Sequence, residues 1–307
     1  MNGKSDHHRF IFLFCSIVTA LSIIAIVGDI LFTAAPAVQH QGLGIIFGTV
    51  WDYTSHQYGA WSFIMATLMV TVATIVLAVP VGLATALFLS EWAPGWLDQI
   101  LMTLIELLVG VPSVVYGILG FFVLRSYFSD FINPFIGKSL GFIPLLTEGH
   151  NYGGLGIPLA ATVLAIMILP TIVALSREAM RGVPAELREG SAALGATQWE
   201  TIRHLVLPMS MSGIITGVIM GIMRAMGETM AIVMLIGNVS NTPISFLSPG
   251  EPLTAKILLD IDNFIIDPDA RSALFALGAI LLVMEIGFIV AIHIISNQMK
   301  KQMEGAT

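Results

Sequence analysis

Six stretches of the chain are apolar and long enough to cross a bilayer as helices, because a crossing helix needs about 20 mainly apolar residues. They are residues 10–34, 61–90, 99–124, 155–176, 209–238 and 272–296. No low-complexity run or linker separates them. The pattern predicts an all-α, polytopic membrane protein with six transmembrane helices, in a single membrane domain over residues 1–307.

The stretch 184–208 interrupts this apolar pattern because it is charged and too polar to enter lipid. Pro184 is suited to the first position of a helix, where its missing N–H is not needed. Glu186 and Glu189 follow within the first turns, where carboxylates favour the positive helix end. Gly195 is the residue type that best adopts the left-handed conformation closing a helix. A short surface helix is therefore predicted from Pro184 to Leu194, with a glycine hinge after it.

A second short helix is predicted directly after this hinge. Thr197 is followed three residues later by Glu200, the spacing of a capping box, in which each residue bonds the other's backbone N–H. Pro208 is expected to bound this second helix. The whole segment is therefore expected to form two capped helices at one membrane surface.

Composition supports the membrane assignment, with 56% hydrophobic and 11% charged residues against about 25% charged in soluble domains. The chain carries a formal net charge of -7 and has no basic patch with interleaved aromatics, which argues against nucleic-acid binding. Gly137, Lys138 and Ser139 resemble the end of a phosphate-binding loop, but Ile132 stands where the first glycine is required. The histidines lack close metal-ligand spacing. We expect no ATP hydrolysis, no metal and no cofactor in this chain.

Lysine and arginine, rather than net charge, set the orientation of a membrane protein. With the N-terminus inside, eight of these residues lie on the inner side: Lys4, Arg9, Arg177, Arg181, Arg188, Arg203, Lys300 and Lys301. Four lie on the outer side: Arg125, Lys138, Lys256 and Arg271. The short turn 91–98 carries Glu91 and Asp98 but no base. The distribution predicts that both termini and the 184–208 segment face the cytoplasm.

Arg224 is the most unusual residue chemically, because it lies about midway along the predicted fifth span. A charge at that depth costs on the order of 2.5 to 3.5 kcal/mol, so it should face protein or water. Glu228 follows four residues later, one turn away on the same helix face, where the two can pair. Arginine's planar fork of donors matches a tetrahedral oxyanion. We expect the pair to lie on an anion pathway; the alternative is a structural ion pair that joins two helices.

Two further acids, Glu106 and Glu285, lie in the third and sixth predicted spans. We expect each to be held neutral by burial or paired with Arg224, Ser or Thr. The alternative is a proton relay, which would be typical of a secondary carrier.

The 184–208 segment resembles the cytoplasmic signature of ABC importer permeases, which reads E-A-A, three residues, Gly, nine residues, Ile, one residue, Leu-Pro. The matching positions are Glu189, Gly195, Leu205, Leu207 and Pro208. Gly190 and Ser191 replace the two alanines, and Leu205 replaces the isoleucine. The resemblance implies that the loop 177–208, including Glu186, is a coupling segment that docks on a separate ATPase subunit.

A second resemblance lies in the membrane. The run R-A-M-G-E-T-M-A from Arg224, followed by Ile236-Gly237-Asn238, is similar to permeases of the phosphate-specific ABC importer, more to the PstC type than to the PstA type. The segment V-P-S-V-V-Y-G at 111–117 fits the same group. The resemblance implies a type I (MetI-like) permease fold, a bacterial inner-membrane location, and phosphate passage by Arg224 and Glu228.

The same resemblance implies partners: a second, PstA-type permease, two ATP-binding PstB-type subunits and a periplasmic phosphate-binding protein of the PstS type. One alternative is the same fold serving another oxyanion, such as molybdate or sulfate. The other is a proton-coupled carrier that uses Glu106, Glu228 and Glu285.

Overall fold

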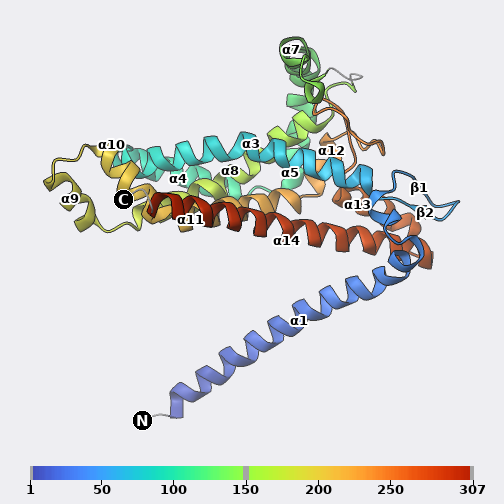
Figure 1. Cartoon of the computed structure of the whole chain (residues 1–307), viewed down its shortest axis with the longest axis horizontal. Helices are drawn as coiled ribbons and strands as arrows, with labels where there is room; N and C mark the ends of the chain where they lie inside the picture. The colour runs from blue at the N-terminus through green and yellow to red at the C-terminus, as the bar shows by residue number, and fades with distance from the viewer. Residues whose placement is uncertain (1–2, 148–151, 305–307) are drawn as a thin grey trace. The chain divides into compact units, whose positions relative to one another are not determined.

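The computed structural model describes the backbone of residues 3–147 and 152–304 (Figure 1). Within these two stretches, six helices are long and apolar enough to cross a membrane, which confirms the predicted all-α class and the number of spans. They are Arg9–Gln41, Trp61–Glu91, Ser113–Leu140, Ile157–Arg181, Gln198–Met226 and Pro268–Ile295. The side chains of Lys4, Lys300 and Lys301, on which the predicted orientation partly rests, lie outside the described residues.

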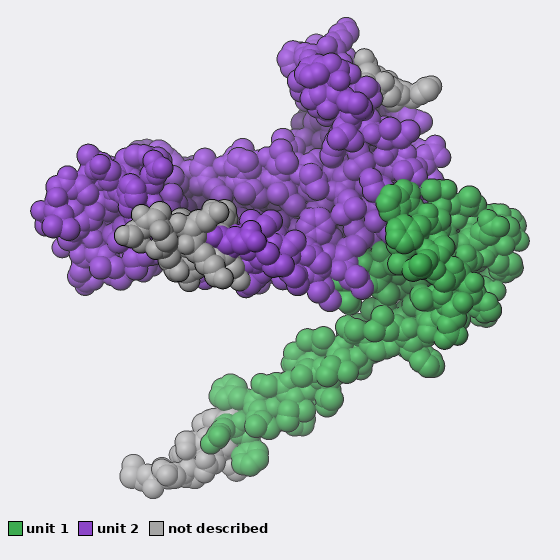
Figure 2. Space-filling view, in the orientation of Figure 1, with its two compact units in different colours: residues 1–61, 257–282 green, residues 62–256, 283–307 purple. Residues whose placement is uncertain are grey.

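The chain divides into two compact units, residues 1–61 with 257–282 and residues 62–256 with 283–307 (Figure 2). The single membrane domain over residues 1–307 stays a prediction.

The first unit contains α1 (Gly3–Gln41), α2 (Gly44–Phe47) and a small antiparallel sheet of β1 (Trp51–Asp52) and β2 (Gln57–Tyr58), in which Trp51 pairs with Tyr58. Within this unit the Ala37 N–H donates to Ser272 Oγ at 2.9 Å. Ala34, Ala37 and Ala273 are buried in its apolar cluster.

The second unit is a bundle of α3 (Trp61–Glu91), α8 (Ile157–Arg181) and α11 (Leu207–Met226), with shorter elements around it. Before α8 come α4 (Gly95–Val109), α5 (Ser113–Leu119), the π-helix Gly120–Leu124, α6 (Arg125–Tyr127), the π-helix Phe128–Ile132, α7 (Asn133–Leu140) and a 3-10 turn at Pro144–Leu146. After it come α9 (Ala185–Ala193), α10 (Gln198–Thr201), the π-helix Ile202–Val206 and α12 (Met230–Leu235). The helices α13 (Leu253–Phe264) and α14 (Pro268–Glu304) have residues in both units, as does α3 through its first residue.

Glycines allow α8 and α11 to pack closely. A Cβ on Gly213 would lie 2.3 Å from the Ala179 Cβ, and one on Gly221 would lie 2.8 Å from Ile172 Cγ1. Real Cβ atoms do not approach that closely, so only glycine fits at these two positions of the helix pair. This close approach of backbones is the packing that membrane helices use where no water drives them together.

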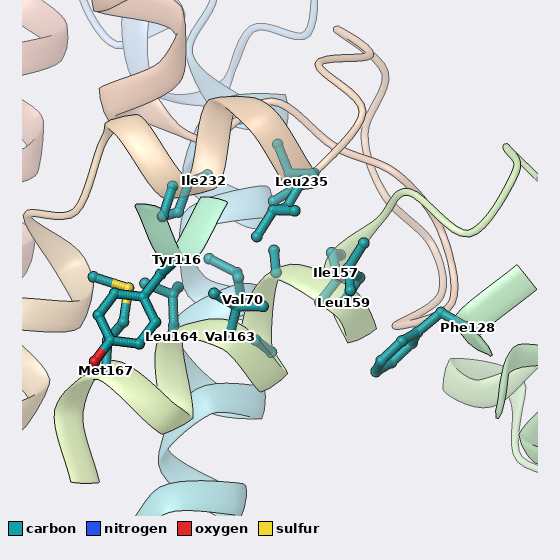
Figure 3. Close-up of a cluster of buried hydrophobic side chains, with 14 of the residues drawn as sticks. Val70, Tyr116, Phe128, Ile157, Leu159, Val163, Leu164, Met167, Ile232 and Leu235 are labelled. Carbon is teal, nitrogen blue, oxygen red and sulfur yellow. The ribbon is translucent and has the colours of Figure 1, made fainter. Parts of the chain in front are cut away.

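The core of the second unit joins α3, α5, α8 and α12. Figure 3 shows Val70, Tyr116, Val163 and Leu235, one from each of these helices, around one apolar interior, and all of them are buried. A helix wrapped in apolar neighbours on several sides is held in place by that packing. The short helix α12 is therefore fixed in the bundle even though it has only six residues.

The third span differs from the prediction of one helix over 99–124. The helix α4 ends at Val109, and the spanning helix begins at Ser113. Pro112 lacks a backbone N–H and disfavours a helical conformation at the residue before it, so the helix breaks there. The Tyr116 hydroxyl donates to the Leu108 carbonyl at 2.9 Å and satisfies one acceptor that the break releases.

Candidate functional site

Arg224 lies in the last turn of α11, half-buried, and not in the middle of a continuous helix. The predicted span 209–238 is interrupted, since α11 ends at Met226 and α12 begins only at Met230. A cation at a helix C-terminus is favoured by the partial negative charge of the last carbonyls. The end of α11 therefore stabilises the guanidinium at this site.

Glu228 lies in the break itself. Its side-chain Oε1 accepts the Ala231 N–H at 3.2 Å, at the start of α12. Its backbone carbonyl accepts the Thr254 hydroxyl at 3.0 Å. The prediction that Glu228 stands one helical turn from Arg224 on the same face is therefore wrong, because the helix ends between them. Across the two described stretches of chain, no ion pair joins Arg224 to Glu228.

Two side chains from other helices surround this break. The guanidinium of Arg224 is close enough to Tyr116 of α5 to interact with it electrostatically. A Cβ placed on Gly227 would lie 3.9 Å from Oε1 of the half-buried Glu285 on α14. The structure therefore places one guanidinium and two carboxylates around a break in a membrane-spanning helix.

Glu106 is not buried in this chain. It is exposed on α4, and no hydrogen bond or ion pair to it is found within residues 3–147 and 152–304. The expectations that burial within the chain holds it neutral, or that Arg224, Ser or Thr pairs with it, are therefore not met.

The segment 111–117 positions α12 at the break. A Cβ on Gly117 would lie 2.8 Å from Met234 Sδ and 3.2 Å from the Ala231 Cα. The helix α5 can therefore approach α12 this closely only because residue 117 is glycine. At the other end of α12, the Leu235 carbonyl accepts the Gly156 N–H at 3.0 Å. Non-helical backbone at membrane depth requires such internal partners.

The predicted first surface helix is α9, which lies with α10 at one end of the second unit (Figure 1). Gly195 has φ +88°, the left-handed conformation expected there. The Gly195 N–H donates to the Ala192 carbonyl at 2.9 Å, and the Ala196 N–H donates to the Ser191 carbonyl at 3.2 Å. These two bonds form the Schellman motif that satisfies the last carbonyls of a helix. Pro184 precedes the helix as its N-cap, one position before the predicted one.

The predicted capping box is present. The Thr197 hydroxyl accepts the Glu200 N–H at 3.3 Å, and the Glu200 carboxylate accepts the Thr197 N–H at 2.7 Å. The second helix does not stop at Pro208, however, because it continues through a π-helical turn, Ile202–Val206, into α11. A wider π turn accommodates a residue that the regular hydrogen-bond ladder cannot, such as proline. Leu205, Leu207 and Pro208 are therefore half-buried parts of the fifth spanning helix.

The outer surface of the loop is exposed and partly apolar. Glu186 and Glu189 are exposed on α9, and the Leu194 side chain at the loop tip is 92% exposed. Leu187 and Trp199 are also exposed. Large apolar side chains exposed on one short surface loop are typical of a surface that another protein covers.

Acidic side chains that the sequence left without an interpretation hold this loop against the bundle. Arg188 of α9 contacts Glu91 at the end of α3, with Nη1 at 2.7 Å from Oε2. Buried Asp98 of α4 accepts hydrogen bonds from Arg177 Nε at 2.7 Å and Nη2 at 2.5 Å, and lies 2.9 Å from Arg181. The bidentate Arg177 contact lowers the pKa of Asp98 below its ordinary value. The sequence contains one signal for these contacts: Glu91 and Asp98 lie in a turn that has no base, whereas the loop 177–208 is rich in arginine.

The sequence matches a known family of membrane transport proteins over most of its length. Residues 78–301 match the family described as "Binding-protein-dependent transport system inner membrane component". The chain is 37% identical over 295 residues to "Phosphate transport system permease protein PstC" of Xylella fastidiosa (strain Temecula1 / ATCC 700964), covering 94% of this chain and 90% of that protein.

Two solved structures share the fold. One is a bacterial alginate ABC transporter, with a TM-score of 0.63 and 12% identity over 98% of this chain and 99% of that one. The other is the MetNI methionine ABC transporter, with a TM-score of 0.50 and 17% identity over 80% of this chain and 94% of that one. The expected MetI-like fold is confirmed.

Proposed function

Because the chain belongs to the family of binding-protein-dependent transport system inner membrane components and, within it, to the PstC-type permeases, we propose that it forms half of a pathway that carries inorganic phosphate across the bacterial inner membrane. The observation that carries the proposal is the position of Arg224 at a break in the fifth spanning helix, beside Glu228 and Glu285. The printed name of the Xylella relative supports phosphate as the substrate.

The chemistry of the break suits a transient anion site. The guanidinium of Arg224 offers several N–H donors in one plane, which match the oxygens of a tetrahedral anion. The carboxylate of Glu228 is engaged with the backbone of α12, so the arginine keeps its charge available for a passing anion. Nearby carboxylates weaken the net attraction, so the anion is bound only weakly and can leave again.

The pathway needs further chains. One arginine-bearing break supplies one wall of a path, so a second permease of the PstA type would supply the other. The exposed surface around Leu194 supports docking of one of the two PstB-type ATPase subunits on the loop 177–208, with Glu186, Glu189 and Gly195 on its outer part and Leu205, Leu207 and Pro208 leading into the membrane. A PstS-type protein would deliver phosphate from the periplasm. Both termini then face the cytoplasm, as the arginine-rich loop does.

Replacing Arg224 tests the anion path. Arg224→Lys keeps the charge but loses the planar donors, so it should support less phosphate uptake than the wild type, and Arg224→Gln should lose nearly all uptake. Glu228 makes no ion pair with Arg224, so adding Glu228→Gln to Arg224→Gln should not restore uptake. Uptake and membrane abundance are measured together in cells. Recovery in the double variant would contradict the path, and normal abundance without uptake supports it.

Two further measurements test the competing assignments, another oxyanion as substrate and a proton-coupled carrier. Excess molybdate or sulfate should not inhibit phosphate uptake; strong inhibition by either would favour another oxyanion. The native complex should purify with an ATPase, whereas a proton-coupled carrier would emerge without one.

A further inference from the structure

Arg188 connects α9 to two membrane-spanning helices at once. Its Nη1 donates to both carboxylate oxygens of Glu91, at 2.7 and 2.9 Å, at the end of α3. Its Nη2 donates to the Met180 carbonyl at 2.7 Å, in the last turn of α8. The Glu91 side chain is only 6% exposed and that of Arg188 is 26% exposed. A planar guanidinium with several bonds in fixed directions is a stiff connection.

The helix α10, which follows α9 in the 184–208 segment, also contacts the end of α3. The side-chain amide of Gln198, the first residue of α10, donates from Nε2 to the Glu91 carbonyl at 3.1 Å. Trp199 stacks on Trp92, with ring centroids 6.4 Å apart and the planes at 19°. Both α9 and α10 therefore contact the chain at residues 91–92.

This meeting point matters because of how the chain is connected. The loop continues directly into α8 on one side and into α11 on the other, so those two helices follow it covalently. The helix α3 is different, since Glu91 and Arg188 are 97 residues apart in the sequence. Movement of α9 reaches α3 most directly through these side-chain contacts.

We propose that Glu91 and Arg188 are positioning residues that transmit movement of the 184–208 segment to α3 during transport. The proposal rests on the proposed function, because it takes an ATPase to be the source of that movement. Breaking the contact leaves the loop folded, since the capping box and the Schellman motif of α9 do not involve Glu91. The ATPase would then still dock and hydrolyse ATP, but α3 would follow only through the remaining contacts of Gln198 and Trp199.

The test uses the complete complex in liposomes, with phosphate uptake per ATP hydrolysed as the readout. Glu91→Gln and Arg188→Gln should each lower this ratio by about tenfold or more, because either change leaves a buried charge unpaired. The double variant should be no lower than Arg188→Gln alone, since interacting residues are not additive. Gln99→Ala is the control: it removes an exposed polar side chain of α4, outside the loop 177–208, and should leave the ratio unchanged.

A purely structural pair would behave differently. Uptake and ATP hydrolysis would then fall together with the amount of assembled complex, and an unchanged ratio in Glu91→Gln would overturn the proposal. Effects that multiply in the double variant would overturn it as well. Arg188→Lys, which keeps the charge, should recover part of the ratio.

A second measurement does not depend on the substrate. In a Cys15→Ser background, spin labels are attached at Val81→Cys on α3 and Ala185→Cys on α9, both exposed. The distance between them should stay constant through the ATP cycle in the otherwise wild-type chain and change in Glu91→Gln. An equal change of this distance in the otherwise wild-type chain and in Glu91→Gln would refute the proposal that the pair transmits movement to α3. A wild-type complex that hydrolyses ATP without taking up phosphate would refute the proposed substrate instead.

Discussion

Gly195 ends α9 in a left-handed conformation, so adding a single methyl group there has a predictable cost. A Cβ at this position would meet nothing within 4 Å, which leaves the backbone angle of φ +88° as the source of strain. The left-handed conformation costs a residue with a side chain about 1–2 kcal/mol. Gly190→Ala is the matched control, because Gly190 lies inside α9 with equal open space and no left-handed angle. Alanine there should stabilise the helix by about 0.5–1 kcal/mol.

Amide hydrogen exchange of residues 185–196 in the purified protein measures both effects. A loss of 1–2 kcal/mol should speed exchange in Gly195→Ala by about 5–30-fold, and Gly190→Ala should slow it by about 2–5-fold. Gly195→Val should exchange faster still, since a β-branched residue tolerates positive φ least, and it should uncouple uptake from ATP hydrolysis while the protein still inserts. Exchange in Gly195→Ala no faster than in Gly190→Ala would refute the reasoning, and unchanged uptake in Gly195→Val would count against the coupling assignment.

Three further predictions concern other parts of the second unit. Thr197→Ala removes the side-chain acceptor at the start of α10 and should destabilise it by about 0.5–2 kcal/mol, read as faster amide exchange there, whereas Thr197→Ser should behave as the wild type. Arg177 lowers the pKa of Asp98, so the stability that this contact supplies is fully present above the ordinary pKa of 3.8 and is lost as pH falls through the lowered pKa. Below about pH 4 the melting temperature should therefore fall by less in Asp98→Asn than in the wild type. Gly117→Val should displace α12 and abolish phosphate uptake, while Gly287→Ala, whose Cβ would meet nothing within 4 Å, should leave uptake intact.

The features that sequence predicted correctly are those whose cause lies within a few residues. The six apolar stretches are long enough to be recognised without their neighbours. The capping box of Thr197 and Glu200 and the left-handed Gly195 each depend on residue types at short, fixed spacing. Such local signals need no knowledge of the tertiary fold.

The break after Met226 could not be predicted in this way. Hydropathy dips at residues 227–229, but the dip is short and apolar residues flank it on both sides, so the sequence pattern predicts one continuous span. The break is stabilised from a distance, by the Thr254 hydroxyl on the Glu228 carbonyl and by the packing of Gly117 against α12.

The ion pairs at the loop were missed for the same reason. Asp98 and Arg177 are 79 residues apart, and only the packing of α4 against α8 brings them together. Charge balance alone predicts that a basic loop attracts acids, but it does not select the partner of each arginine.

The continuous passage of the fifth span from the capping box to Arg224 has a geometric consequence. The helix Gln198–Met226 has 29 residues, which at 1.5 Å per residue gives a rod of about 43 Å. One end of this rod lies in the exposed loop and the other bears the guanidinium. Tilting it by about 8° about its middle would shift each end by about 3 Å, the length of one hydrogen bond. In the proposed pathway, a swing of that size is enough for Arg224 to gain or lose a contact with an anion, so the site can be switched by geometry without unfolding any element.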